Sequence, residues 1–124
     1  MKKELMFGTA TDKERLLVSP KNHELVSSYV GTTINFEKIF KITEIPTIDT
    51  DSGEEGMYDT AVGVTTDGKM IAIPNKVAIN SIENFIETMY DEGLIVKTLS
   101  VIPKEIKSSS GNKYIDFEIV DFTI

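Results

Sequence analysis

The sequence predicts an all-β fold, a small β-barrel that contains one helix, and three observations lead to this class. Five segments alternate apolar and polar residues, as half-buried strands do. One segment, between the third and fourth of these strands, repeats its apolar residues at helical spacing. Five strands of this length expose unpaired edges unless the sheet curls on itself, so we expect a closed barrel.

The composition indicates one folded domain. The chain has 124 residues, of which 40% are hydrophobic and 27% charged, and it contains no cysteine. No apolar run approaches the length of a membrane span, and the first residues contain no continuous apolar leader. We therefore expect a cytoplasmic protein without membrane contact. Residues 1–31 are expected to form an N-terminal extension, and residues 32–124 the barrel.

The extension is expected to hold a short helix. Ser19 followed by Pro20 is typical of a helix N-terminus, and Gly31 is typical of the position after a helix end. This pattern predicts a helix over about residues 20–30.

Residues 32–45 are expected to form the first barrel strand. Ile34, Phe36, Phe40 and Ile42 share one parity, and Lys38-Ile39 breaks the alternation. A strand that changes faces in this way commonly contains a bulge or strong bend. Such a strand can pair with two halves of a barrel.

The next two strands are expected over residues 57–66 and 69–73. A loop over residues 46–56, rich in acidic residues, precedes them. Asp67-Gly68 between them is a strong signal for a two-residue hairpin turn, and Pro74 ends the second strand.

The helical segment begins after Asn75, which can cap it, and ends before Gly93. Its apolar residues recur at helical spacing, so we expect them to fill the core. The fourth strand is expected over residues 94–102, with a break at Pro103. A loop over residues 104–113 leads to a fifth strand over residues 114–122. We expect the last residues to continue that strand and not to form a flexible tail.

This order of elements fits the OB-fold, a five-stranded Greek-key barrel with a helix between strands three and four. The alternative is an α+β sheet with the helix packed flat against it. In an OB-fold, ligands lie across the second and third strands, between the first-to-second and fourth-to-fifth loops. The first of these loops is acidic here, and the second is basic.

Several short motifs resemble a known family. They are Asp67-Gly68, Ala78-Ile79 with Ser81-Ile82, the lysine-rich segment 104–113, and the run from Tyr114 to Glu118. Together they resemble small single-stranded DNA-binding proteins encoded by phages and mobile elements of Gram-positive bacteria. The resemblance covers about residues 32–120. It implies an OB-fold that coats single-stranded DNA during replication or recombination in the cytoplasm of a bacterial host. Replication or recombination proteins and a second copy of the chain are the protein partners it suggests.

Single-strand binding needs aromatic faces for stacking and a positive track for phosphates. Tyr58 and Tyr114 are the candidate stacking residues, with Phe40 as a weaker one. Phe36, Phe85 and Phe117 have the parity or spacing of core residues. The candidate phosphate contacts are Lys38, Lys41, Lys69, Lys76, Lys97, Lys104, Lys107 and Lys113.

The net charge of −7 opposes this hypothesis, because phosphate binding depends on lysine and arginine. The alternative is an acidic OB-fold module that binds a basic protein or mimics DNA. An enzyme is not expected, since the one histidine, His23, has no catalytic partners at a supporting spacing. The acidic loop lacks EF-hand spacing, so neither a metal nor a cofactor is expected.

Overall fold

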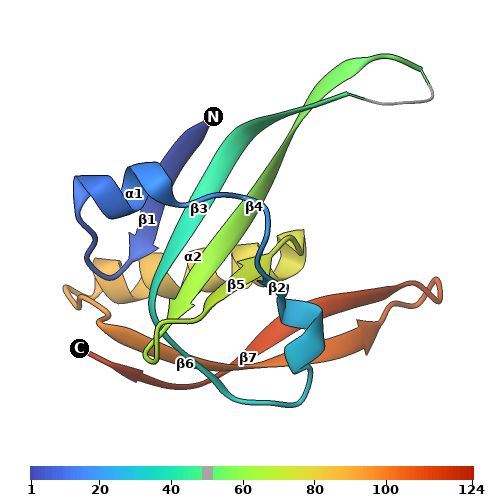
Figure 1. Ribbon diagram of the computed structural model, residues 1–124. Helices are drawn as coiled ribbons and strands as arrows, with labels where there is room; N and C mark the ends of the chain where they lie inside the picture. Colours follow the sequence, from blue (N-terminus) through green and yellow to red (C-terminus); the bar gives the residue numbers. More distant parts are fainter. Residues whose placement is uncertain (49–51) are drawn as a thin grey trace.

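The computed structural model describes residues 1–48 and 52–124, and it shows a mostly β molecule with one long helix (Figure 1). The strands are β1 (Lys2–Phe7), β2 (Glu24–Leu25), β3 (Ile34–Ile48), β4 (Glu55–Thr65), β5 (Met70–Ile73), β6 (Thr98–Lys107) and β7 (Lys113–Thr123). The helices are α1 (Asp12–Leu17), the 3-10 helix η1 (Val26–Tyr29) and α2 (Lys76–Asp91).

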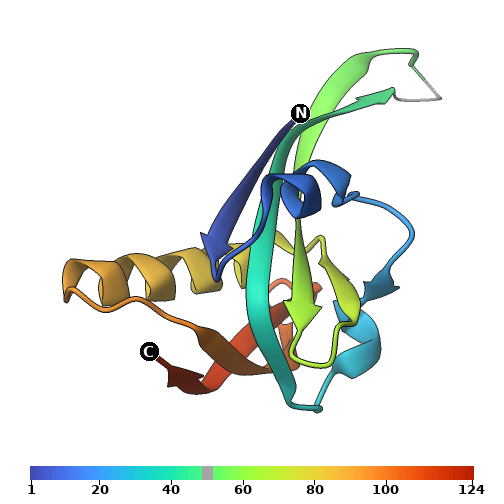
Figure 2. The same cartoon turned by 60° about the vertical axis from the view of Figure 1, so that its left-hand side comes forward.

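All seven strands belong to one curled sheet. Its order is β2-β5-β4-β3-β6-β7, and β1 pairs with β3 beside that path. The predicted succession of three strands, a helix and two strands is confirmed for β3 to β7. β2 forms one edge of this order and pairs with β5, and β7 forms the other edge and pairs with β6 among the described residues. The two ends of this order, β2 and β7, do not pair with each other over the residues that the structure describes. The sheet is therefore a curled half-barrel and not the closed barrel that we expected, and α2 packs across its inner face (Figure 2).

β3 is the strand that joins the two halves of the sheet. One of its edges pairs with β4, and the other pairs first with β6 over Ile34–Phe36 and then with β1. The predicted bulge is confirmed by a register shift between Phe36 and Lys38. A second irregularity follows at Glu44, which has a φ of 56° and donates its backbone N–H to Asp59 at 3.3 Å. These bulges bend β3 so that both neighbours can be reached.

The bent sheet has an apolar core on each face. The inner core packs against α2 and includes Phe36, whose ring meets that of Phe117 edge-on at 6.5 Å. The outer core comprises Val18, Phe40, Ile42, Ile45, Val62 and Val64. β3 supplies side chains to both cores, which explains the change of parity in its sequence.

The predicted N-terminal helix over residues 20–30 is confirmed only in its last turn, the 3-10 helix η1 before Gly31, and its start at Ser19-Pro20 is wrong. Residues 20–23 are irregular, and β2 and η1 follow. The helix of this region is α1, where the Thr11 hydroxyl accepts from the Glu14 backbone and the Glu14 carboxylate accepts from the Thr11 backbone. This reciprocal pair is a capping box, and its sequence signature is present at these positions.

The predicted break at Pro103 is also wrong, because β6 runs through it. The Pro103 carbonyl accepts from the backbone N–H of Gly31 at 2.9 Å, away from β7. The proline ring nitrogen faces the same edge, where no ladder hydrogen bond is needed. β6 therefore reaches Lys107, and the predicted loop shortens to residues 108–112. The acidic loop shortens as well, because β3 extends to Ile48 and β4 begins at Glu55, while residues 49–51 lie outside the described part.

α2 matches its prediction. Asn75 holds the N-cap position, although its side chain makes no capping hydrogen bond. The helix ends where Gly93 adopts a φ of 77° and Leu94 donates to the Met89 carbonyl at 2.9 Å. β7 also matches, since it continues as a strand to Thr123. None of the described helices is long and apolar enough to cross a membrane.

Candidate nucleic-acid interface

The outer end of the β6–β7 hairpin, residues 104–116, carries four of the predicted residues, and we call it the finger. Lys104 and Lys107 lie on β6, while Lys113 and Tyr114 begin β7. The tip is a closed turn, in which the Ser108 N–H donates to the Asn112 carbonyl at 2.7 Å. The finger is therefore a regular two-stranded ribbon and not a long loop.

Lys107 and Lys113 are direct cross-strand partners in the finger. Like charges in this relationship destabilise a ribbon unless an anion lies between them. Tyr114 follows directly and is 37% exposed, while its neighbour Ile115 is buried. The predicted alternation at this site is confirmed. Because successive side chains of a strand point to opposite faces, the ring of Tyr114 lies on the face of the finger opposite to Lys107 and Lys113.

Acidic residues neutralise part of this charge. Lys104 pairs with Glu118 at 2.6 Å, and Lys113 pairs with Glu105 at 3.2 Å. Lys107 has no ion pair within the described part of the chain. All four paired side chains are about half exposed, and exposed pairs of this kind contribute little free energy. A phosphate could therefore replace either carboxylate at small cost.

A groove of about 290 Å³ lies between β4 and the first turn of α2. It is lined by Lys41, Met57, Tyr58, Asp59, Lys76, Ile79 and Asn80. Tyr58 is 39% exposed here, and the first turn of α2 contains no acidic residue. Lys41 forms an ion pair with Glu83 on α2, so its ammonium is already engaged. Tyr58 and Lys76 are thus the available groups of this groove.

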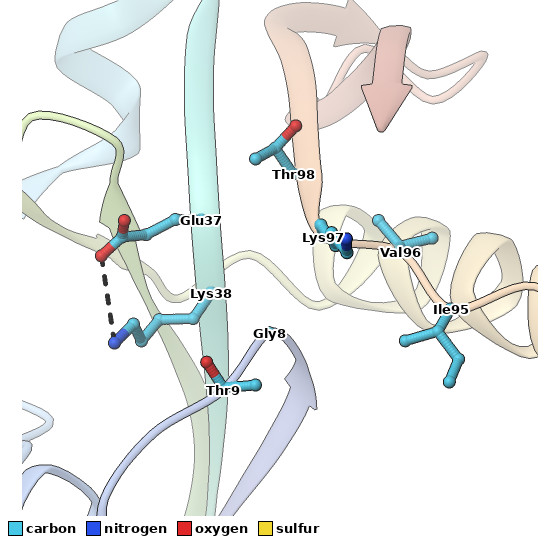
Figure 3. Close-up of a pocket in the computed structure, with 8 residues that line it drawn as sticks. All are labelled: Gly8, Thr9, Glu37, Lys38, Ile95, Val96, Lys97 and Thr98. Atoms are coloured by element: carbon cyan, nitrogen blue, oxygen red, sulfur yellow. Dashed lines mark ion pairs between the residues drawn. The ribbon is translucent and has the colours of Figure 1, made fainter. Parts of the chain in front are cut away.

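A third place gathers Lys38 and Lys97 around a hollow of about 460 Å³ (Figure 3). The hollow lies where β1 and β6 separate along the edge of β3. Lys38 bonds to Glu14 at 2.7 Å and lies 3.9 Å from Glu37, and its side chain is only 12% exposed. Lys38 is therefore a structural lysine, and its predicted role as a phosphate contact is not supported by its surroundings.

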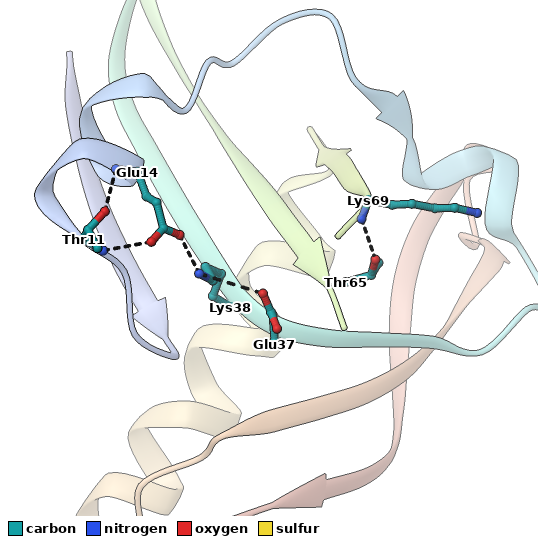
Figure 4. Close-up of polar contacts among 6 residues, drawn as sticks. All are labelled: Thr11, Glu14, Glu37, Lys38, Thr65 and Lys69. Carbon is teal, nitrogen blue, oxygen red and sulfur yellow. Dashed lines mark hydrogen bonds and ion pairs between the residues drawn. The ribbon is translucent and has the colours of Figure 1, made fainter. Parts of the chain in front are cut away.

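Lys69 stands apart from these places, after the β4–β5 turn. Its backbone N–H donates to the Thr65 hydroxyl at 2.9 Å, and its side chain extends away from the turn (Figure 4). The hydrogen bond from the same hydroxyl lowers the pKa of Asp67 below its usual value. A hollow beside this turn is also lined by Tyr29. The hydrogen bond that the Tyr29 hydroxyl donates to Glu24 raises the pKa of Tyr29. The Thr65 hydroxyl thus bridges the turn by hydrogen bonds, and Lys69 is its exposed cation.

The face predicted to bind a ligand is covered over part of its area. Phe40, Val62 and Val64 point to the outer core, where Val18 packs on them. Phe40 is 1% exposed and Val18 is 2% exposed. Phe40 is therefore a core residue in this arrangement. Sequence reasoning missed this cover, although the Thr11–Glu14 capping box marked the helix that belongs to it.

The structure thus distributes the predicted residues over four places and does not form one continuous positive track. The finger and the groove between β4 and α2 each combine an exposed tyrosine with lysines. Both the β3–β4 hairpin and the finger extend past the N-terminal end of α2 (Figure 1). Comparisons with protein-family models, curated proteins and solved structures gave no match for this chain.

Proposed function

We propose that the protein binds single-stranded DNA without strong sequence preference, as the family it resembles does. One observation carries the proposal: the finger presents Lys107 and Lys113 as cross-strand partners on one face and the half-exposed ring of Tyr114 on its other face. Two opposed ammonium groups suit a phosphate, and the exposed ring on the other face of the same ribbon suits a stacked base. Tyr58 and Lys76 would provide a second contact of the same kind.

The order of elements in the half-barrel, three strands, a helix and two strands, supports this proposal because the OB-fold has the same order. We infer that β3, β4, β5, α2, β6 and β7 form an OB-type barrel in which β2 and η1 occupy the opening beside β5. In that assignment the β3–β4 hairpin and the finger are the two loops that bracket a ligand. The two exposed tyrosines then lie one on each bracketing hairpin.

The test is the affinity for a labelled oligo-dT, measured by fluorescence anisotropy at several salt concentrations. We expect binding that weakens steeply with salt, because phosphate contacts release counterions. The double substitution Lys107→Glu and Lys113→Glu should weaken binding at least about tenfold, since it converts both phosphate contacts to repulsion.

The control is Lys13→Glu with Lys21→Glu, two exposed lysines away from the finger. It changes the net charge by the same amount and should weaken binding much less. Equal losses in the two double variants would show that the finger is not the contact site.

A second candidate function is binding of a basic protein. The projecting part of the β3–β4 hairpin, residues 44–48 and 52–60, carries Glu44, Glu54, Glu55 and Asp59 and neither lysine nor arginine. This charge would repel phosphates and attract a cationic surface. If neither single-stranded nor duplex oligonucleotides bind at low salt, this function is favoured over the first.

A further inference from the structure

Residues 8–25, which we call the strap, cross the outer face of the sheet from the end of β1, through α1, to β2 (Figure 2). Val18 is the one buried residue of this range. Leu16 and Leu17, which precede it, are 64% and 70% exposed. The strap therefore contributes a single wholly buried side chain to the outer core.

The face beneath the strap is apolar. Its residues come from β3 and β4 and are all at most 8% exposed: Phe40, Ile42, Ile45, Val62 and Val64. An aromatic ring flanked by branched aliphatic side chains offers a surface on which planar bases can stack. Leu5 of β1 and Ala10 of the strap also pack against this cluster. Without the strap, the part of the face that Leu5 does not cover would form an exposed apolar patch, and such patches mark binding sites.

Few contacts hold the strap. The Lys38 ammonium bonds to the Glu14 carboxylate at 2.7 Å (Figure 4). The Lys3 ammonium donates to the Leu16 carbonyl at 2.7 Å. At its far end, β2 pairs with β5 through only two residues. Both bonded carbonyl and carboxylate groups are exposed, so water can replace these hydrogen bonds.

These contacts must offset the conformational entropy of the whole segment. Segments with few buried apolar contacts and exposed hydrogen bonds open at lower free energy than the rest of the fold. The sheet beneath retains the inner core and α2 on its other face when the strap leaves. The strap can therefore separate without unfolding the half-barrel.

We propose that the strap is a displaceable cover over a second base-binding face, and that single-stranded nucleic acid displaces it. The proposal rests on the function proposed above. In the OB-type assignment the covered face lies between the two bracketing hairpins. With the strap closed, Tyr58 and Tyr114 are separate contacts; with the strap open, the face of Phe40, Val62 and Val64 connects them.

Hydrogen exchange measured by mass spectrometry tests the displacement without any ligand. Val18→Ala removes the buried anchor, and Glu14→Gln removes the ion pair with Lys38 while leaving the core intact. We expect exchange of residues 12–23 to rise about tenfold in Val18→Ala and less in Glu14→Gln. Exchange in β4 and α2 should stay unchanged in both.

Leu17→Ala is the matched control, because it shortens a neighbouring side chain that is exposed. It should leave exchange of the strap at the wild-type rate. The displacement is refuted if the strap and β4 accelerate together in Val18→Ala while Glu14→Gln leaves the strap unchanged, since the strap would then unfold only with the sheet.

Binding of labelled oligo-dT tests the ligand. A closed strap reduces the apparent affinity by the fraction of open molecules, so Val18→Ala should bind about fivefold to tenfold tighter than wild type, and Leu17→Ala should bind like wild type. Oligo-dT should also accelerate exchange of residues 12–23 in the wild-type protein.

Weaker or unchanged binding by Val18→Ala, or slower exchange of the strap with oligo-dT bound, would overturn the proposal. Absence of binding by every variant would instead refute the proposed function, while the exchange experiment would still decide whether the strap opens.

Discussion

The ammonium of Lys38 on β3 lies 2.7 Å from the carboxylate of Glu14 on α1, and this pair joins two segments that are 24 residues apart. Both the capping box and the attachment of α1 to the sheet depend on Glu14 (Figure 4). Lys38 also lies near Glu37, at 3.9 Å. One carboxylate thus serves the local helix and the tertiary contact together.

Acid should loosen the strap through Glu14. The hydrogen bond from Lys38 lowers the pKa of Glu14 below its ordinary value of 4.5. A group with a lowered folded-state pKa stabilises the fold above its unfolded pKa, and this contribution is lost as the pH falls through the folded value. Exchange of residues 12–17, corrected for the intrinsic pH dependence, should therefore increase below pH 4.5. Glu14→Gln should lack this transition, and its persistence in that variant would assign it to another group.

Gly63 on β4 is predicted to be intolerant of a side chain. A Cβ at this position would lie 2.2 Å from the Phe36 ring, which is wholly buried. Gly63→Ala should lower the free energy of unfolding by about 1–3 kcal/mol, measured by urea denaturation. Gly56→Ala, also on β4, is the control, because its Cβ would meet only Thr47 at 3.7 Å. Equal stability of the two variants would contradict the packing of Phe36 under β4.

We predict that the aromatic ring of Tyr114 contributes to DNA binding and that its hydroxyl group does not. If the ring stacks a base, Tyr114→Ala should weaken oligo-dT binding by about 1–3 kcal/mol, and Tyr114→Phe should bind like wild type. Anisotropy titrations measure both. Tyr90→Ala is the control, because Tyr90 is 75% exposed near the end of α2 that faces away from the finger. A similar loss in Tyr90→Ala would exclude a specific role of Tyr114.

Lys41 is predicted to stabilise the fold and not to bind phosphate. It pairs with Glu83 across the β3–α2 contact, and the two side chains are 29% and 27% exposed. A double-mutant cycle with Lys41→Ala and Glu83→Ala should give a coupling energy of about 0.5–1 kcal/mol in thermal or urea unfolding. Oligo-dT affinity should change less than twofold in Lys41→Ala. A large loss of oligo-dT affinity in Lys41→Ala, together with no coupling energy between Lys41 and Glu83, would indicate that Lys41 contacts the DNA.

Local signals in the sequence were reliable where one segment decides its own structure. The periodicity of α2, its Asn75 start and its Gly93 end are local properties. The turn at Asp67-Gly68 is also local, although it is one residue longer than the predicted two-residue turn, because Thr65 and Lys69 are its closing pair. The bulge near Lys38 was predictable because β3 must change faces to serve two cores. The edge position of Pro103 was not, since it depends on Gly31, which belongs to a distant segment.

The candidate site was predictable only as a set of residue types. The sequence indicated that Tyr114 points away from the core, and this is confirmed by its exposure. It did not indicate which lysines are neutralised, because Lys38 and Lys41 find their carboxylates 24 and 42 residues away. Lysines that outnumber the acidic residues in one stretch of sequence can form ion pairs with carboxylates from distant segments of the fold. A count of lysines within that stretch therefore overestimates the positive charge available to bind phosphates.

By itself, the sequence determined the succession of strands around one amphipathic helix, because hydrophobic periodicity reports which face of each element is buried. Only the tertiary structure decided what buries the outer face of β3 and β4. A strand pattern shows which apolar side chains share a face, but whether and by what Phe40 and Val62 are covered depends on a contact between distant segments. Here the strap, through Val18, covers the outer face of β3 and β4. The finger and the groove beside Tyr58 therefore remain as the exposed candidate contacts.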